Sequence, residues 1–396
     1  MGYINFKEER FKAKSQLKKR RENNKKLFDE LIKNRELPNT YNPDKEYSYK
    51  EFNLKHFGGG KILGEDDFIE IANVDIICSI FTNCTFGNIK FKECSFIGCK
   101  FYECNFESGG VLFENCTFFK EESEKKPSLN RFDNFSCEFY KCNIYAKFDG
   151  CILSYLIFDK CLIHNSFFNL SDMSSLMVIN SEFKRIRIED CDLSGAKIID
   201  TYIIDLDFTD KMKTKFDQKT FFDQIKLREK NRDEYEGIYM TYETIADKFK
   251  ENSLNNNFGE YYYLAKKIER NVLDFVPKLS SYFYWATCGY GERPINSIVF
   301  SLIMMIIFGI LYSIFGIEID DTNNVISLMK YNIYNYREIF DCLKEGIILS
   351  INLFSGVGAN ESIPVNLSEI IASFEIVFGV IMMGIGTGTV VRKLVR

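Results

Sequence analysis

The sequence predicts a protein of mixed class: a coil of short stacked strands, a helical hairpin, and an all-α membrane domain. Three observations predict it. Large apolar residues recur every five positions in the middle of the chain, two apolar stretches near the C-terminus are long enough to cross a bilayer, and a shorter one lies between them. We expect a charged N-terminal helical segment (1–50), the coil (51–210), a hairpin linker (211–276) and the membrane domain (277–396).

The composition changes along the chain, so its averages say little. At 396 residues the chain exceeds the usual size of one domain. Residues 1–36 contain no apolar core of a cleaved signal peptide, so we expect the N-terminus to stay in the cytoplasm. The most basic run, Lys18 to Arg21, either lies on a solvated helix face or is attracted to anionic lipid or an acidic partner.

A five-residue repeat organises the middle of the chain. Its first unbroken series is Ile71, Ile76, Phe81, Phe86, Phe91, Phe96, Phe101 and Phe106. A small or apolar residue lies two positions before each of these, and the period returns from Phe148 to Phe208 after a polar insertion. A period of five fits neither an α-helix nor a single strand. It fits a square coil, in which each side points one large and one small residue inward.

This pattern resembles the pentapeptide-repeat family over residues 69–210. The resemblance implies a right-handed quadrilateral β-helix of about seven coils, with strands stacked roughly 4.8 Å apart and both ends capped. Some members of the family mimic DNA and bind topoisomerases, which requires a strongly acidic rod. Because this rod mixes basic and acidic residues, we expect neither that role nor a nucleic-acid partner.

The cysteines have a structural interpretation. Most of the 13 occupy the small inward position, where a reduced thiol acts as a small hydrophobe. A metal site would need paired cysteines with histidine partners, but Cys94, Cys99 and Cys104 follow the five-residue period and the chain has 2 histidines. We therefore expect no metal and no cofactor. No phosphate loop or nucleophile elbow appears, so the chain is not expected to be an enzyme.

A helical hairpin is expected after the coil. Apolar residues recur at helical spacing from Tyr235 to Phe249, and the polar segment 252–259 reads as a helix breaker. A second helix is expected at about Glu260 to Leu273. The tyrosines of the first helix are expected to be core residues.

Two spans are expected at about 295–317 and 365–391. The first contains no charged side chain, and its length of about 34 Å exceeds a bilayer core of about 30 Å. Lys278 and Arg293 precede it, while Arg392 and Lys393 follow the second span. By the positive-inside rule we expect a multi-pass protein of the cell membrane with both termini in the cytoplasm.

A re-entrant pore loop is expected between the spans, at about 338–361. Its apolar end, Gly346 to Phe354, is too short to cross a bilayer and is followed by a glycine-rich segment. At membrane depth such a segment is tolerated only where it lines a water-filled cavity or is buried by protein.

This layout resembles the two-transmembrane potassium-channel family over residues 293–396. The resemblance implies a selectivity filter of Ser355, Gly356, Val357, Gly358, Ala359 and Asn360, with Glu361 at the outer mouth. Val357 and Gly358 match the family's Thr-Val-Gly-Tyr-Gly filter, whereas its threonine, tyrosine and second glycine are replaced. Four copies would surround the ion, and these replacements predict weaker potassium-over-sodium discrimination.

Three further features of the membrane domain have alternative interpretations. Glu375 either buttresses the pore helix or filter, or is a snorkelling or neutral buried acid. Gly379 is either the hinge of the second span or a small residue at a close helix contact. The segment Gly289 to Glu292 resembles a filter but precedes the first span, so we expect a turn there.

The sequence therefore predicts a homotetrameric channel that conducts monovalent cations, K⁺ or Na⁺. Its cytosolic β-helix would serve as a sensor or as a docking module for a cytosolic protein or ligand. The alternative is a membrane-anchored scaffold that binds a partner protein without conducting ions.

Overall fold

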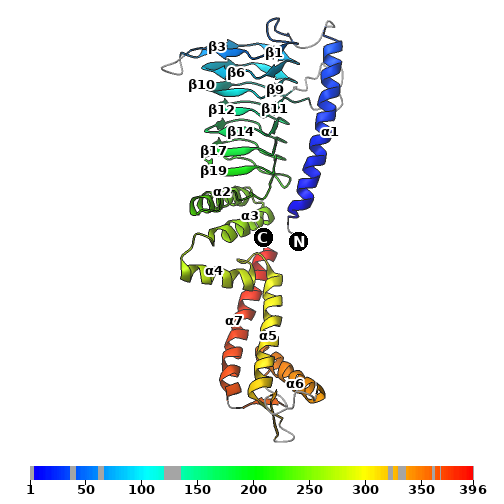
Figure 1. Cartoon of the computed structure of the whole chain (residues 1–396), viewed down its shortest axis with the longest axis vertical. Helices are drawn as coiled ribbons and strands as arrows, with labels where there is room; N and C mark the ends of the chain where they lie inside the picture. The colour runs from blue at the N-terminus through cyan, green and yellow to red at the C-terminus, as the bar shows by residue number, and fades with distance from the viewer. Residues whose placement is uncertain are drawn as a thin grey trace. The chain divides into compact units, whose positions relative to one another are not determined.

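The computed structural model of the chain describes residues 4–35, 42–60, 67–119, 135–319, 324–328, 336–358, 362–365 and 367–395. The chain divides into two compact units, Met1–Val272 and Leu273–Arg396. Figure 1 shows stacked strands and helices in the first unit, and helices with short strands in the second.

The strands of the first unit are short and pair in parallel with strands of neighbouring coils. They are β1 (Glu51–Asn53), β2 (His56–Gly58), β3 (Ile69–Ala72), β4 (Asp75–Ile77), β5 (Ile80–Thr82), β6 (Thr85–Gly87), β7 (Ile89–Lys92), β8 (Ser95–Ile97), β9 (Lys100–Tyr102), β10 (Asn105–Glu114), β11 (Glu138–Tyr140), β12 (Asn143–Asp149), β13 (Ile157–Asp159), β14 (Leu162–His164), β15 (Phe167–Asn169), β16 (Met177–Ile179), β17 (Glu182–Glu189), β18 (Lys197–Ile199), β19 (Tyr202–Phe208) and β20 (Phe221–Phe222). Their stacking gives a β-solenoid of about seven turns, as predicted.

Inward phenylalanines hold successive turns together. Phe101 pairs in register with Phe81 in the preceding turn and Phe139 in the next. Its ring stacks on theirs at centroid distances of 4.9 and 4.4 Å. The corners between strands adopt the left-handed conformation, as at Asn83 (φ 50°), which asparagine tolerates better than most residues. The five-residue register is therefore confirmed.

The cysteines form columns inside the solenoid. The Sγ atoms of Cys104, Cys142 and Cys161 each donate to a carbonyl oxygen of the preceding turn at 3.3 Å. Ser166 occupies the equivalent inward position elsewhere, and its Oγ donates to the Ile144 oxygen at 3.2 Å. All 13 cysteines are buried free thiols. Burial raises the pKa of Cys191 to about 12, which disfavours the reactive thiolate.

The solenoid extends beyond the predicted end at residue 210, because β20 forms the last rung of the eight-stranded sheet β1-β5-β9-β11-β13-β16-β18-β20. Helices α2 (Arg232–Glu251) and α3 (Asn255–Glu269) follow it. The prediction of a helix breaker over 252–259 is wrong about its length. The turn between α2 and α3 is shorter, because Ser253 is left-handed (φ 59°) and α3 already begins at Asn255.

The hairpin of α2 and α3 caps the last turn of the solenoid. The Tyr261 hydroxyl donates to the Phe222 carbonyl at 2.8 Å and accepts from the Phe222 amide at 2.9 Å. The Tyr242 hydroxyl accepts from the Ile225 amide at 2.7 Å. Of the first helix's tyrosines, Tyr242 is a core residue, as predicted, whereas Tyr235 and Tyr239 are only half-buried. Tyr242 and Tyr261 also satisfy backbone groups at the end of the solenoid.

Within the described residues of the second unit, two helices are long and apolar enough to cross a membrane. They are α5 (Pro294–Phe315) and α7 (Leu367–Val395). The first ends earlier than predicted because Gly316 (φ 114°) breaks it and β21 (Ile317–Ile319) begins. The remaining elements are α4 (Phe275–Cys288), α6 (Tyr336–Phe354), β22 (Asn324–Ile326) and β23 (Ser362–Pro364), and both β22 and β23 pair with β21.

Candidate functional site

A single carboxyl group joins three helices of the second unit. Glu375 lies on α7 with a relative exposure of 0%. Its Oε2 accepts a hydrogen bond from the Tyr312 hydroxyl of α5 at 2.5 Å. Its Oε1 lies 2.5 Å from the Ser350 hydroxyl of α6. The helix between the two apolar helices is therefore fixed to both of them through one buried residue.

The hydrogen atoms of this cluster can be counted. The Ser350 hydroxyl lies 2.8 Å from the Met305 carbonyl oxygen as well as 2.5 Å from Glu375 Oε1, yet it carries one proton. A proton on Glu375 Oε1 would let the carboxyl donate to Ser350 and Ser350 donate to Met305. Glu375 could be singled out from the sequence. Tyr312 and Ser350 were missed, although each places a hydroxyl group in a largely apolar stretch of helix.

Glycines allow these helices to approach closely. A Cβ atom on Gly346 of α6 would lie 2.3 Å from the Gly309 oxygen of α5. A Cβ atom on Gly379 of α7 would lie 2.4 Å from the Phe354 oxygen at the end of α6. At Gly379 the structure thus contains the close helix contact, and α7 continues through this position.

The segment after α6 turns sharply at its glycines. Gly356 (φ 76°) and Gly358 (φ 93°) are left-handed, on either side of Val357. The amides of Val357 and Gly358 both donate to the Asn352 carbonyl oxygen, at 3.0 and 3.2 Å, and the Ser355 hydroxyl donates to the same oxygen at 3.2 Å. Val357 is 69% exposed. Ala359, Asn360 and Glu361 lie outside the described residues.

The filter-like segment Gly289 to Glu292 forms a turn, as predicted, and contacts the end of α7. Glu292 is fully buried, and its carboxylate lies 2.9 Å from Arg392 and 3.7 Å from Lys393. A Cβ atom on Gly291 (φ 79°) would lie 2.9 Å from the Arg392 guanidinium. The turn could be predicted from the sequence, whereas this ion pairing could not.

In the first unit, helix α1 (Phe6–Lys33) packs along the solenoid (Figure 1). It lies over the eight-stranded sheet near its start and over the β4–β8 pair near its end. Its apolar side chains cover outward-facing apolar residues of the solenoid. Near its start, Ala13 and Leu17 pack with Ile157, Met177, Ile179, Ile199 and Phe221. Near its end, Leu27 and Phe28 pack with Ile77, Cys78, Ile97 and Phe135. Several of these outward residues recur at intervals of 20, about one per turn, and this spacing in the sequence could have predicted the apolar stripe.

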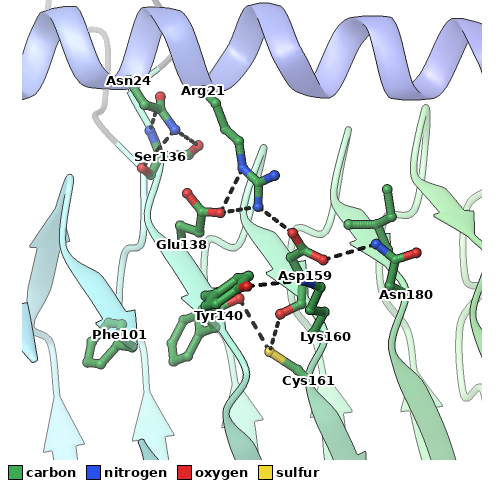
Figure 2. Close-up of polar contacts among 12 residues, drawn as sticks. Arg21, Asn24, Phe101, Ser136, Glu138, Tyr140, Asp159, Lys160, Cys161 and Asn180 are labelled. Atoms are coloured by element: carbon green, nitrogen blue, oxygen red, sulfur yellow. Dashed lines mark hydrogen bonds and ion pairs between the residues drawn. The ribbon is translucent and has the colours of Figure 1, made fainter. Parts of the chain in front are cut away.

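The arginines of α1 bind the solenoid through polar contacts, and Figure 2 shows those of Arg21. Arg21 forms ion pairs with Glu138 and, at 2.6 Å, with Asp159. Arg10 donates two hydrogen bonds to Asp223 at 2.6 and 2.8 Å. Arg20 donates to the carbonyl oxygens of Tyr155 and Ser175, both at 2.9 Å. Of the predicted basic run, Arg20 and Arg21 are therefore not on a solvated face.

The electrostatics of these arginines differ. Burial lowers the pKa of Arg20 to about 10, since its partners are neutral carbonyl groups. Burial also disfavours the charge of Arg21, but hydrogen bonds from Arg21 to Asp159 and Glu138 outweigh it and raise the pKa. Among the residues that the structure describes, no group of three or more His, Cys, Asp or Glu side chains could hold a metal ion.

Comparisons with known proteins concern the solenoid. Residues 79–108 match the family model for pentapeptide repeats, in 8 copies. No curated protein sequence matches the chain. The full-length structure of QnrB1, a plasmid-mediated fluoroquinolone resistance protein, is 15% identical with a TM-score of 0.18, over 43% of this chain and 94% of that one. A trypsin-treated QnrB1 variant is 12% identical with a TM-score of 0.16, over 45% and 91% of the two chains. At these values the similarity carries no argument about function.

Proposed function

We propose that the chain forms a tetrameric channel for monovalent cations, with the solenoid as a cytosolic sensor or docking module. In this proposal α5 and α7 span the membrane, α6 is a re-entrant pore helix, and the segment from Ser355 lines the ion path. The proposal is supported by the way Glu375 fixes α6 between the two apolar helices.

The observation that carries the proposal is the backbone at the end of α6. Left-handed residues at Gly356 and Gly358 flank Val357, whose φ is not positive. In an extended strand successive carbonyl groups point to opposite sides, whereas alternating left- and right-handed residues can turn them to the same side. Carbonyl oxygens turned to one side can replace the water around a cation.

The exposed apolar surface of the second unit supports membrane insertion and assembly. On α5, large apolar side chains at Ile298, Leu302 and Ile306 are about half exposed, and on α7 Phe374 and Val377 are more exposed. Exposed apolar patches of this extent are typical of lipid or subunit contacts. One loop cannot surround an ion, so a ring of copies is required, and four is the number implied by the resembled family.

The ion preference follows from the filter sequence. Gly356 replaces a threonine whose hydroxyl would complete a coordination site, and Ala359 replaces a tyrosine that would brace the ring. We therefore propose potassium conduction with weaker potassium-over-sodium discrimination than in the resembled family.

Two measurements on the purified full chain test the proposal. Its particle mass in nanodiscs is expected to correspond to four copies. Planar bilayers containing it under a KCl gradient are expected to carry current that reverses near the cation equilibrium potential. A folded monomer or dimer, or a folded tetramer with no cation conductance, would contradict the proposal.

The second candidate is a membrane-anchored scaffold that binds a partner without conducting ions. It is favoured by the solenoid face that holds α1, which has both apolar and charged contacts suited to a helix. The same bilayer recording separates the two candidates, because a scaffold would give no current.

A further inference from the structure

The inward core of the solenoid is built almost entirely without α1, of which only Phe6 packs against it, at the end that the α2–α3 hairpin caps. Its inward residues stack on one another, as Phe101, Phe139 and Phe158 do, each with a relative exposure of 1% or less. Helix α1 has 28 residues, of which Ala13, Leu17, Asn24, Leu27 and Phe28 are buried. Apart from Phe6, helix α1 therefore packs on the outer surface of the solenoid.

The face beneath α1 has a defined charge pattern, seen in part in Figure 2. One acidic pair, Glu138 and Asp159, binds Arg21. A second pair, Asp200 and Asp223, binds Arg10, and Lys14 also lies 2.6 Å from Asp200. Because Arg10 and Arg21 are 11 residues apart, about three helical turns, both point to the same side of the helix. The face thus recognises a helix with two cations at this spacing.

The arginines of α1 contact the solenoid more consistently than its lysines do. All three, Arg10, Arg20 and Arg21, bind the solenoid. Among the lysines, Lys14 contacts Asp200, whereas Lys12 and Lys18 have side chains 53% and 81% exposed. Arginine suits forked contacts with carboxylate and carbonyl oxygens, which explains its place on the inner side. The side chains of Arg10 and Arg21 remain 29% and 36% exposed, so salt can weaken their ion pairs.

We propose that this face of the solenoid, lined by Glu138, Asp159, Asp200 and Asp223, is a docking site for a basic amphipathic helix of a partner protein, with α1 as its resident occupant. The partner helix carries arginines at positions i and i+11, with small or apolar residues at i+3 and i+7. These offsets are those of Arg10, Arg21, Ala13 and Leu17. Because α1 is tethered to the solenoid, its local concentration at the site is about millimolar. A partner helix must therefore bind the site tightly enough to displace α1, or the binding of α1 must first be weakened.

The site can be tested in the full chain with a labelled peptide of residues 4–35 as the probe. The variant Arg10→Glu/Arg21→Glu should release α1 without altering the solenoid, and it should bind the peptide at least tenfold more tightly than the wild-type chain. Adding Glu138→Gln and Asp159→Asn should remove that gain. A control peptide with Arg10, Arg20 and Arg21 each changed to Gln should bind at least tenfold more weakly. Equal binding by the wild-type and variant chains, or by the two peptides, would overturn the proposal.

Hydrogen exchange on the wild-type chain provides a second test that needs no variant. Raising the salt from about 0.05 M to about 0.5 M should increase exchange in α1 while the strands β9, β11 and β13 stay protected. If α1 is as protected as these strands at both salt concentrations, it is a permanent part of the fold and the proposal fails. Neither test depends on whether the second unit conducts ions.

Discussion

Replacing Glu375 by alanine should destabilise the second unit much more than replacing it by glutamine. Glutamine keeps the shape of the side chain, and its amide can accept from Tyr312 and donate to Ser350. Ser350 can then donate to the Met305 carbonyl, as the hydrogen count in this cluster requires. Alanine removes both contacts and leaves a buried cavity.

The size of the effect follows from what alanine removes. The Tyr312 hydroxyl is left buried without its acceptor, at a cost of about 1–3 kcal/mol, and the cavity adds a further cost of roughly 1–2 kcal/mol. We therefore expect Glu375→Ala to lower the free energy of unfolding by about 2–5 kcal/mol, and Glu375→Gln to change it by less than about 1 kcal/mol.

The assay is thermal unfolding of the full chain in one detergent, followed by the fraction of protein that keeps its native size. The alanine variant should unfold at least about 5 °C below the glutamine variant. Equal melting of the two variants would mean that the hydrogen bonds of Glu375 do not hold α6 in place.

Three further predictions concern other parts of the chain. Phe101→Ala should destabilise the solenoid by about 3–5 kcal/mol in denaturant titrations, because the Phe101 ring stacks on two neighbouring rings. The control Phe11→Ala, at a 75% exposed position, should change the free energy of unfolding by less than about 0.5 kcal/mol. Burial disfavours ionised Asp200, but Lys14 and Lys226 outweigh burial and lower the pKa of Asp200. The contribution of Asp200 to α1 binding is therefore present above about pH 4 and is lost as the pH falls further. A spin label attached at Phe11→Cys should become more mobile below about pH 4, and this increase in mobility should be smaller in a chain that also carries Asp200→Asn. The triple variant Gly356→Thr/Ala359→Tyr/Asn360→Gly should raise potassium-over-sodium selectivity, measured as a shift in reversal potential, and an unchanged value would argue against this segment as the filter.

The solenoid could be predicted from sequence because its repeat is local. Each turn places one large residue inward every five positions, so residues such as Phe81 and Phe101 reveal the register directly. The end of the solenoid was missed because the last turn is irregular. Between Ile198 and its partner Phe222 the chain takes 24 residues instead of the 20 that separate Phe81 from Phe101.

The contacts of α1 could not be predicted from its own sequence, which is charged along most of its length. Its binding depends on outward residues such as Ile157 and Met177, which are 20 positions apart and form a stripe only after the coil has formed. The partners of Glu375 were missed for a similar reason. Tyr312 and Ser350 are 63 and 25 residues away, and only helix packing brings them to the carboxyl group.

The proposal that the segment after α6 lines an ion path is tested most directly by introducing one thiol there. All native cysteines are buried, so a positively charged thiol reagent should react mainly with Val357→Cys, a position that is 69% exposed. In planar bilayers the reagent should reduce the current of this variant and leave the current of the wild-type chain and of Phe11→Cys unchanged. Complete labelling of Val357→Cys, verified by mass, with no change in its current would contradict the account.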